Sequence, residues 1–375
     1  MNKKKCLLAF ISSIASITVL SVVLINGNAF KTFAEDDASD VVWGHYDAVE
    51  AKTARAGSKE YWISCSTHEI LFEAPTIYKE IIDRGEPQGS FDSSDSRYIA
   101  PIGSVPELIN GNTQVKYGIC PQTVLEDDGE IYDALDKLSP ESNGYYIYNG
   151  EYYAKTIGSV YNGNNYVFSN GNTIVNDETY WFKVEPIIWK VLPDDGNHYY
   201  LLSTIPVDTH RFNEKFTGPV DGLYCNNYEH SEIRSWINNE FYNTAFTNNS
   251  FILTTEVDNS ASTTDSVNNA YVCDNTFDKV FLLSYRDYIN ESYGFPSTNI
   301  STSNPARYMT ATDWVRARGA TCTENSSYSC AYWSRSPRNG GPTSTWNTTD
   351  FGTLSIMQTG NDNRCVRPAI KITIA

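Results

Sequence analysis

Residues 180–192 constrain the fold of this chain more than any other segment. From Trp181 to Leu192, aromatic and β-branched side chains form one long run, which is typical of a β-strand. Pro186 lies inside the run and has no N–H group to donate, so it indicates a sheet edge or a β-bulge at that position. A strand of this length needs neighbouring strands, and the sequence therefore predicts a domain built on a β-sheet.

Several shorter segments are expected to supply those neighbours. Asn149-Gly150 separates two tyrosine-rich runs and predicts a β-hairpin, because both turn residues readily adopt positive φ. Further strands are expected at 114–120 and at 199–203, the second after a turn at Asp195-Gly196. The chain ends in a segment with a period of two, which predicts a half-buried strand. Its apolar face comprises Val366, Pro368, Ile370, Ile372 and Ile374, and its polar face comprises Arg367, Lys371 and Thr373.

Helical patterns are fewer. The clearest helix begins at Ser231, a good N-cap, with Glu232 in the first turn, where the helix dipole favours a carboxylate. A second helix is expected from 310 or 312 to Arg318, with Gly319 as its C-cap, and a shorter helical pattern lies at 131–138. The apolar face of the clearest helix comprises Ile233, Trp236, Ile237 and Phe241. Strands and helices together predict an α+β fold.

The first 34 residues have the layout of a secretory signal peptide. Lys3 to Lys5 form a basic start, residues 7–25 are apolar, and Thr32-Phe33-Ala34 places small residues before a cleavage site. We therefore expect a secreted, extracellular mature chain that begins near Glu35. The alternative is an uncleaved N-terminal membrane anchor, since the apolar run approaches the ~20 residues that span a bilayer. No second such run follows, so the mature form is not expected to span a membrane.

The charge of the chain argues against one class of partner. The formal net charge is −17, and the leader contains four lysines and no acidic residue, so the mature part is near −21 (−17 − 4). Such a surface repels phosphate backbones, and nucleic-acid binding is not expected. The sequence contains no phosphate-binding glycine loop, dinucleotide-binding fingerprint or zinc-peptidase motif, and no cofactor is expected.

Composition divides the mature chain into two parts. Residues 35–100 form a polar N-terminal segment, in which a strand at 60–65 suggests a small, degenerate ribbon-like β-unit. His45, Cys65 and His68 are weak metal candidates there, because zinc normally takes four ligands and only these are visible. A metal-free β-unit is the alternative. Residues 101–375 carry the dense strand and helix signals and are expected to form the main domain.

Cysteine usage is consistent with export. Seven cysteines follow the leader, and disulfides are permitted in an exported chain. The odd number leaves one cysteine free or paired with another chain. Cys322 and Cys330 flank a polar loop and form the first expected disulfide, and Cys225 with Cys273 forms the second, although spacing alone does not determine the connectivity.

Six motifs resemble those of a C-terminal domain of unknown function in secreted proteins of Gram-positive bacteria. They are Phe182 to Leu192, Arg234 to Phe246, Asp278 to Ser284, Ala317 to Ala320, Trp333 to Pro337 and Val366 to Ala369. That domain in turn resembles the C-type-lectin fold, in the variant of the sulfatase-modifying enzymes. The resemblance implies a twisted mixed or antiparallel sheet with two main helices and two late strands that carry Trp and Arg. The expected structural core comprises Trp189, Trp236, Phe241, Trp333, Arg335 and Arg367.

A shared fold does not establish chemistry. The sulfatase-modifying relatives use a cysteine pair between the two late strands, where this chain has only Cys365, so oxidase activity is not expected. The calcium motifs of lectins are also incomplete, because the Glu-Pro at 185–186 and the Trp-Asn at 346–347 are not followed by the required residues. No catalytic residue is therefore assigned.

The polar loops between Arg335 and Arg364 are the candidate ligand surface. The expected ligand-binding residues are Trp346, Tyr332, Arg338 and Asn347. An exposed tryptophan among hydroxyls and amides suits a sugar or a protein epitope. The alternative is an ordinary hairpin in which Trp346 folds inward.

The sequence favours a secreted, non-catalytic binding module for an extracellular glycan or protein. Two alternatives stay open. One is an enzyme of unidentified reaction on a sulfatase-modifying-factor-like fold, and the other is a structural component of the cell surface or matrix. A pocket that joined several charged motif residues would favour the enzyme; those residues are Asp278, Arg234, Arg335, Arg367 and Glu185.

Overall fold

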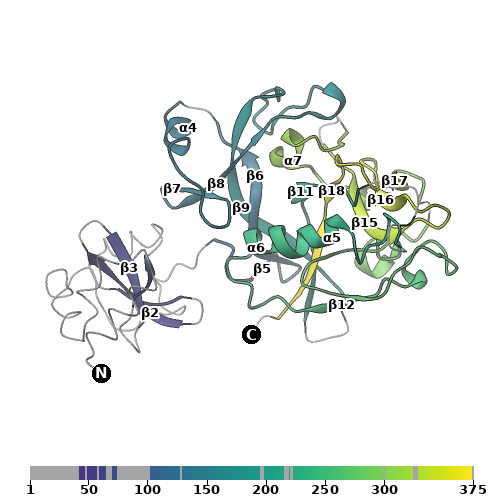
Figure 1. The fold of residues 1–375 in the computed structure, drawn as a ribbon, viewed down its shortest axis with the longest axis horizontal. Coiled ribbons are helices and arrows are strands. Elements are labelled where there is room, and N and C mark those ends of the chain that lie inside the picture. The colour runs from purple at the N-terminus through teal and green to yellow at the C-terminus, as the bar shows by residue number, and fades with distance from the viewer. Residues whose placement is uncertain are drawn as a thin grey trace. The chain divides into compact units, whose positions relative to one another are not determined.

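We analysed a computed structural model of the chain, which divides into two compact units, residues 1–101 and residues 102–375 (Figure 1). In the first unit the structure describes the strand residues 42–46, 49–56, 59–64 and 70–73. In the second unit it describes residues 102–373 apart from 127–128, 195–197, 215–218, 220–222, 299 and 324–327. Each unit is described by itself.

The described strands of the first unit form one antiparallel sheet in the order β1-β2-β3-β4. Their bounds are Val42–Tyr46, Val49–Ala56, Lys59–Ser64 and Ile70–Glu73. The strand predicted at 60–65 corresponds to β3. Of the three metal candidates, His45 belongs to β1, whereas Cys65 and His68 lie outside the described residues.

The second unit contains a large antiparallel sheet with the strand order β14-β19-β10-β9-β6-β5, extended by β8 on β9 and β7 on β8. Its strands are β5 Glu107–Ile109, β6 Gln114–Val124, β7 Tyr146–Tyr148, β8 Glu151–Ile157, β9 Thr179–Leu192, β10 Tyr199–Ser203, β14 Phe281–Leu282 and β19 Pro368–Ile372. The predicted hairpin is the β7–β8 turn, where Asn149 and Gly150 have φ of 50° and 81°. The predicted turn at 195–196 lies outside the described residues.

A β-bulge accommodates Pro186 in β9, as predicted. Lys116 of β6 pairs with Ile188, and Ile119 pairs with Pro186, so β6 has one more residue than β9 in this interval. Gly118 lies within the bulge with φ of +71°, a conformation that favours glycine. On the opposite edge of β9, β8 pairs with residues 179–183 and β10 with residues 189–192. Pro186 thus lies between these two partners, where its missing N–H breaks no ladder bond on that edge.

A second, smaller sheet has the order β11-β18-β15-β16-β17, in which only β15 and β18 run parallel among its described pairs. Its strands are β11 Asp208–Thr209, β15 Tyr332–Pro337, β16 Ser344–Thr348, β17 Leu354–Gln358 and β18 Cys365–Val366. A separate two-stranded ribbon joins β12 Thr255–Val257 to β13 Thr276–Asp278.

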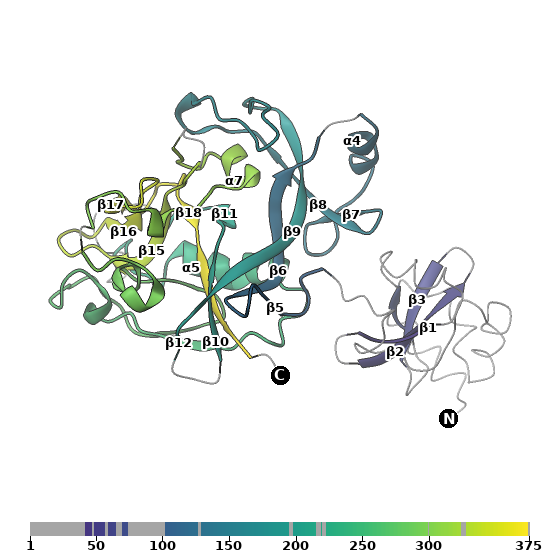
Figure 2. The ribbon, with the colours of Figure 1, turned by 180° about the vertical axis from the view of Figure 1, so that it is seen from behind.

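The predicted long helix is present and continuous from Glu232 to Ala245. It consists of α5 Glu232–Trp236, a π-helical turn η5 Ile237–Phe241, and α6 Tyr242–Ala245. Ser231 is its N-cap, and its hydroxyl accepts a hydrogen bond from the N–H of Arg234 at 3.3 Å. Figures 1 and 2 show this helix on one side of β6 and β9, where Ile233, Ile237 and Phe241 are buried in a shared cluster.

The remaining helices are short. The predicted second helix is α7 Asp313–Ala317, capped by Thr312 and followed by Gly319 with φ of +81°. The pattern at 131–138 corresponds to α4 Glu130–Leu135, which ends before Leu138. Single 3-10 turns are η4 Tyr161–Gly163, η6 Ala261–Thr263, η7 Asp287–Ile289, η8 Glu291–Tyr293 and η9 Pro305–Arg307. The described residues therefore form a mixed α+β structure dominated by strands.

The closing strand differs from its prediction, because it is buried on both faces rather than half-buried. All residues from Arg364 to Ile370 are buried, and Lys371 is the first that is partly exposed. The physical reason is that both faces are packed, since Val366, Ile370 and Ile372 belong to one buried cluster and Cys365 and Ala369 belong to another. Arg367 is accommodated there because its guanidinium donates to the Ser203 carbonyl at 2.9 Å and to the Tyr332 hydroxyl at 3.0 Å.

Candidate functional site

The polar motifs of the sequence hold the scaffold together. Arg234 on α5 pairs with the buried carboxylate of Asp278 on β13, with Nη2 and Oδ1 2.7 Å apart. The Asn238 side chain donates to the Val280 carbonyl at 2.8 Å and accepts from the N–H groups of Lys279 and Val280. These bonds join the helix motif to the motif at 278–284, which gives both motifs a structural role.

The motif at 333–337 is fixed in a similar way. The Arg335 guanidinium donates to the Leu282 carbonyl at 2.8 Å, to Asp287 at 3.1 Å and to the Asp258 carbonyl at 2.9 Å. Glu185 accepts from the Thr123 hydroxyl at 2.6 Å. The charged motif residues that would have favoured an enzyme therefore each have their own partners, and none of them lines the cavity described below.

The structure places the expected ligand-binding residues at different depths. Tyr332 has no exposed surface and donates its hydroxyl to the Arg307 carbonyl at 2.8 Å. Asn347 is only 1% exposed, and Trp346 is partly buried with its ring centroid 4.6 Å from that of Tyr285. Arg338 retains exposed surface. Tyr332 and Asn347 therefore do not reach a ligand in this conformation, and Trp346 packs inward on the β16–β17 hairpin.

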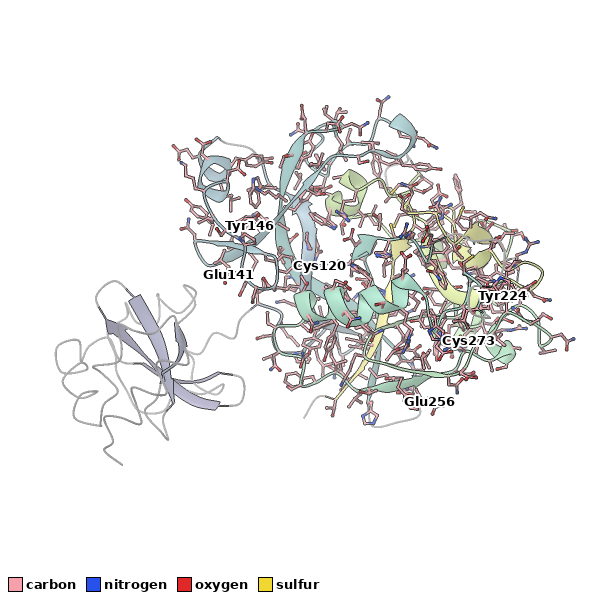
Figure 3. All side chains as sticks on the ribbon, viewed as in Figure 1. Cys120, Glu141, Tyr146, Tyr224, Glu256 and Cys273 are labelled. Atoms are coloured by element: carbon pink, nitrogen blue, oxygen red, sulfur yellow. The ribbon has the colours of Figure 1, made fainter. Side chains whose placement is uncertain are left out.

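A different part of the second unit contains a cavity of about 340 Å³. Its walls come from β6, β7 and the loop before it, β8, β11, the α5–α6 helix and α7. Its aromatic side chains are Tyr145, Tyr146, Trp236, Phe241 and Trp314, and its polar ones are Asn143, Lys155, Asp208, Glu240 and Thr244. Cys120, Pro121, Gly144, Ala154 and Val207 complete the lining. Figure 3 labels Tyr146 and Cys120 on two of these walls.

Local structure fixes most of these side chains. Trp236 stacks on Phe241 and on His210, with ring centroids 5.8 Å and 5.1 Å away. Trp314 packs edge-on against Phe182 at 5.2 Å, and the Arg318 guanidinium lies 5.2 Å from its ring centroid. The aromatic walls are therefore held before any ligand arrives, which lowers the entropy lost on binding.

Two of the three charged lining residues have partners of opposite charge. Asp208 accepts from Arg318 Nε at 2.5 Å. Lys155 Nζ lies 3.4 Å from Asp136 and 4.8 Å from the centroid of the Trp181 ring. Glu240 is exposed, and no described residue forms an ion pair or hydrogen bond with its carboxylate. One uncompensated negative charge is thus left at the cavity.

The titratable groups on the cavity wall are unsuited to nucleophilic chemistry. Burial raises the pKa of the Cys120 thiol well above its ordinary value, and the charges of Asp208 and Glu185 raise it further. Burial, followed by Cys120 and Asp208, likewise raises the pKa of Tyr145. Both groups stay protonated at neutral pH, and a protonated thiol is a poor nucleophile.

Sequence reasoning placed Trp236 and Phe241 in the core and did not find the cavity. Trp189, Phe241, Trp333, Arg335 and Arg367 are indeed buried, but Trp236 keeps exposed surface at the cavity. The only indication of the cavity in the sequence was that Trp236 lies at the margin of the apolar face of its helix, next to Ile233 and Ile237. The cavity itself is formed by segments near 120, 145, 208, 240 and 314, whose proximity depends on the tertiary fold.

Neither predicted disulfide is present. All six described cysteines are free thiols. Cys322 and Cys330 are directly opposite each other in an antiparallel bridge, but they are not bonded. Cys225 donates to the Pro342 carbonyl at 3.3 Å and accepts from the Thr359 hydroxyl, whereas Cys273 faces the backbone of Tyr228 and Glu229.

Among the described residues, no group of three or more potential ligands is arranged to hold a metal ion.

Comparison with known proteins identifies one region. Residues 208–374 match a domain of unknown function, DUF6273, which confirms the prediction of a C-terminal domain of that class. The match starts at β11 and includes the second sheet, whereas β5 to β10 precede it. No curated protein and no solved structure matches the chain. Within the described residues, no helix is both long and apolar enough to cross a bilayer.

Proposed function

We propose that the protein is a secreted binding module that recognises an extracellular glycan in the cavity lined by Trp236 and Trp314. The observation that carries this proposal is the lining, which combines five aromatic side chains with five polar ones. A sugar ring has apolar faces and a hydroxyl rim, so it can pack on aromatic rings while its hydroxyls bond to carboxylates, amides and hydroxyls. The volume lies within the range of small-molecule sites, roughly 300–1,000 Å³.

The proposal also includes the type of fold. We infer a C-type-lectin-like core, supported by two main helical segments, α5–α6 and α7, by the late strand β15, which carries Trp333 and Arg335, and by Arg367 between β18 and β19. Secretion is supported by the basic, apolar and small-residue order of the first 34 residues.

The protonation and the ion pairing of the cavity side chains favour a binding role over an enzymatic one. Cys120 and Tyr145 stay protonated, Asp208 is held by Arg318, and the charged motif residues have structural partners elsewhere. A purely structural surface component would not need a preformed concave site with aromatic walls.

A glycan array probed with the mature chain, residues 35–375, tests the proposal. We expect Trp236→Ala to weaken binding of the best glycan roughly 30-fold, as for a central aromatic anchor. Phe277→Ala is the matched control, because Phe277 is 67% exposed and lies outside the cavity, and it should leave affinity unchanged. Near-ultraviolet circular dichroism verifies that both variants fold.

Three outcomes would contradict the proposal. Absence of any bound glycan would remove the ligand class and favour a structural role. Equal affinity of Trp236→Ala and the parent would remove the site. Turnover of a bound glycan, detected by mass spectrometry, would support the enzyme alternative.

A further inference from the structure

The charge balance of the cavity indicates more about its ligand than its shape does. Lys155 is compensated by Asp136 and Asp208 by Arg318, while Glu240 has no partner among the described residues. A ligand that covers Glu240 displaces water from its carboxylate, and this desolvation is unfavourable unless the ligand supplies a donor or a positive charge. The charged lining residues and their partners thus carry a net charge of −1, which favours cationic ligands over anionic ones.

The cavity already holds one ammonium group on aromatic rings. Lys155 Nζ lies 5.3 Å from the ring centroid of Tyr146 and 4.8 Å from that of Trp181, both within the range of cation–π attraction. At the wall formed by the α5–α6 helix, no lysine or arginine of the described chain lies over the rings of Trp236 or Phe241. That wall has the same kind of aromatic surface without a cation of its own.

Glu240 is positioned to complete such a site. It is four residues after Trp236 and directly precedes Phe241, so it belongs to the same stretch of the helix and lines the same cavity. The chain as a whole is also acidic, with a formal net charge of −17.

We infer that the glycan ligand carries an ammonium group, which binds between the Glu240 carboxylate and the rings of Trp236 and Phe241. The inference rests on the proposed function and specifies its ligand class as an amine-bearing sugar with a free amino group. N-acetylated, uronic and phosphorylated sugars are disfavoured, because each lacks the positive charge or adds a negative one.

Calorimetry with two matched oligosaccharides tests this inference on the mature chain. The probes are an oligomer of β-1,4-linked glucosamine and its fully N-acetylated counterpart of equal length. We expect the amine form to bind about ten-fold more tightly, and its affinity to fall as salt rises. Glu240→Gln should abolish this preference with little effect on the N-acetylated form. Glu256→Gln is the control, because Glu256 is the exposed residue of β12 and lies outside the cavity, and it should preserve the preference.

The outcomes separate this inference from the proposed function. If both oligomers bind equally and Trp236→Ala weakens both, the ammonium preference is wrong and the glycan site stands. If Glu240→Gln keeps the preference, Glu240 does not hold the amine and the inference fails. If neither these oligomers nor any glycan on the array binds, both proposals fail together.

Discussion

At the scale of single residues, the polar motifs are explained by buried bonds rather than by chemistry. Asp278 has a side chain only 1% exposed, and it accepts from Arg234 and from the Thr276 hydroxyl. A buried carboxylate of this kind is tolerated because its partners replace water. A sequence motif that contains Arg, Asp and Asn can thus suggest catalysis although its side chains only bind one helix to one strand.

Removal of one partner should reveal this role. We expect Asp278→Ala to lower the free energy of unfolding by about 3 kcal/mol, because the partly buried Arg234 guanidinium then loses its buried counter-charge. The control is Glu107→Ala, which breaks an exposed pair with Lys116 and should cost at most about 1 kcal/mol. Urea unfolding followed by tryptophan fluorescence measures both; equal losses would mean that the Asp278 pair is not a structural fastening.

At the scale of elements, Gly118 links the bulge in β6 to the helix packed on it. A Cβ at this position would meet the Phe246 ring at 2.6 Å, and the backbone has φ of +71°. We expect Gly118→Ala to destabilise the protein by about 3 kcal/mol, through both left-handed strain and displacement of Phe246. Gly111→Ala is the control, since Gly111 has φ of +64° and no neighbour within 4 Å of its Cβ position. It should cost only the strain, about 1 kcal/mol, so similar thermal midpoints for the two variants would refute the packing contribution.

The elements also show what sequence alone could predict. The hairpin at Asn149-Gly150, the Ser231 cap and the bulge near Pro186 depend on local backbone chemistry, so they were predictable. The burial of both faces near Arg367 depends on two clusters packed against the closing segment, whose other members come from distant parts of the chain. The cavity was missed for the same reason, because Trp236 and Asp208 become neighbours of Tyr145 only in the folded sheet.

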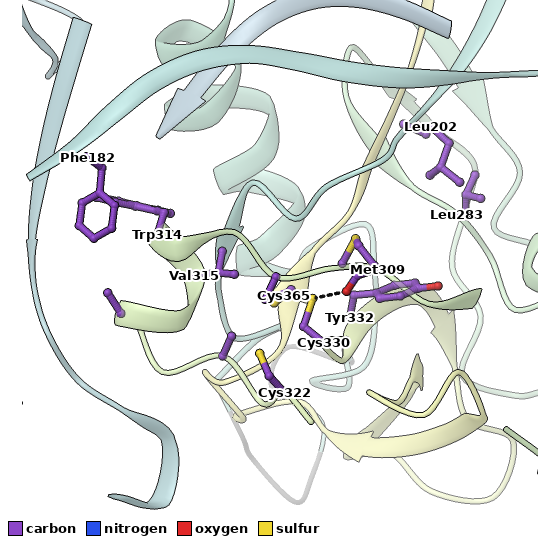
Figure 4. Packing of buried hydrophobic residues seen from close by; sticks show 14 of the residues in the cluster. Phe182, Leu202, Leu283, Met309, Trp314, Val315, Cys322, Cys330, Tyr332 and Cys365 are labelled. Atoms are coloured by element: carbon purple, nitrogen blue, oxygen red, sulfur yellow. Dashed lines mark hydrogen bonds between the residues drawn. The ribbon is translucent and has the colours of Figure 1, made fainter. Parts of the chain in front are cut away.

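At the scale of the whole second unit, three cysteines from two distant segments meet in one core. Cys322, Cys330 and Cys365 are buried in the same cluster as Met309 and Tyr332, and Figure 4 shows the three sulfur atoms near one another. The Cys330 thiol donates to the Met309 carbonyl at 3.2 Å. Their access to solvent therefore requires opening of the core rather than motion of one loop.

The pH dependence of stability tests this arrangement. The pKa of Cys322 is raised mainly by its hydrogen bond with Cys330 and then by burial, and the pKa values of Cys330 and Cys365 are raised mainly by burial. In the unfolded chain these thiols ionise near their ordinary pKa of about 8.5, whereas in the folded chain they remain protonated. The folded state then binds more protons than the unfolded state, so their contribution to stability is complete below about pH 8.5 and declines as pH rises above it.

We therefore expect the reduced protein to lose stability between about pH 8.5 and 9.5, measured as a shift of the urea midpoint. The variant with alanine at 322, 330 and 365 should be less stable at pH 7 but show a weaker decline over this range. Iodoacetamide should label the three thiols at pH 8 only at the rate of global unfolding, while partly exposed Cys273 reacts in the native state. Rapid native labelling of Cys330, or an identical pH decline in the alanine variant, would show that the core does not shield these thiols.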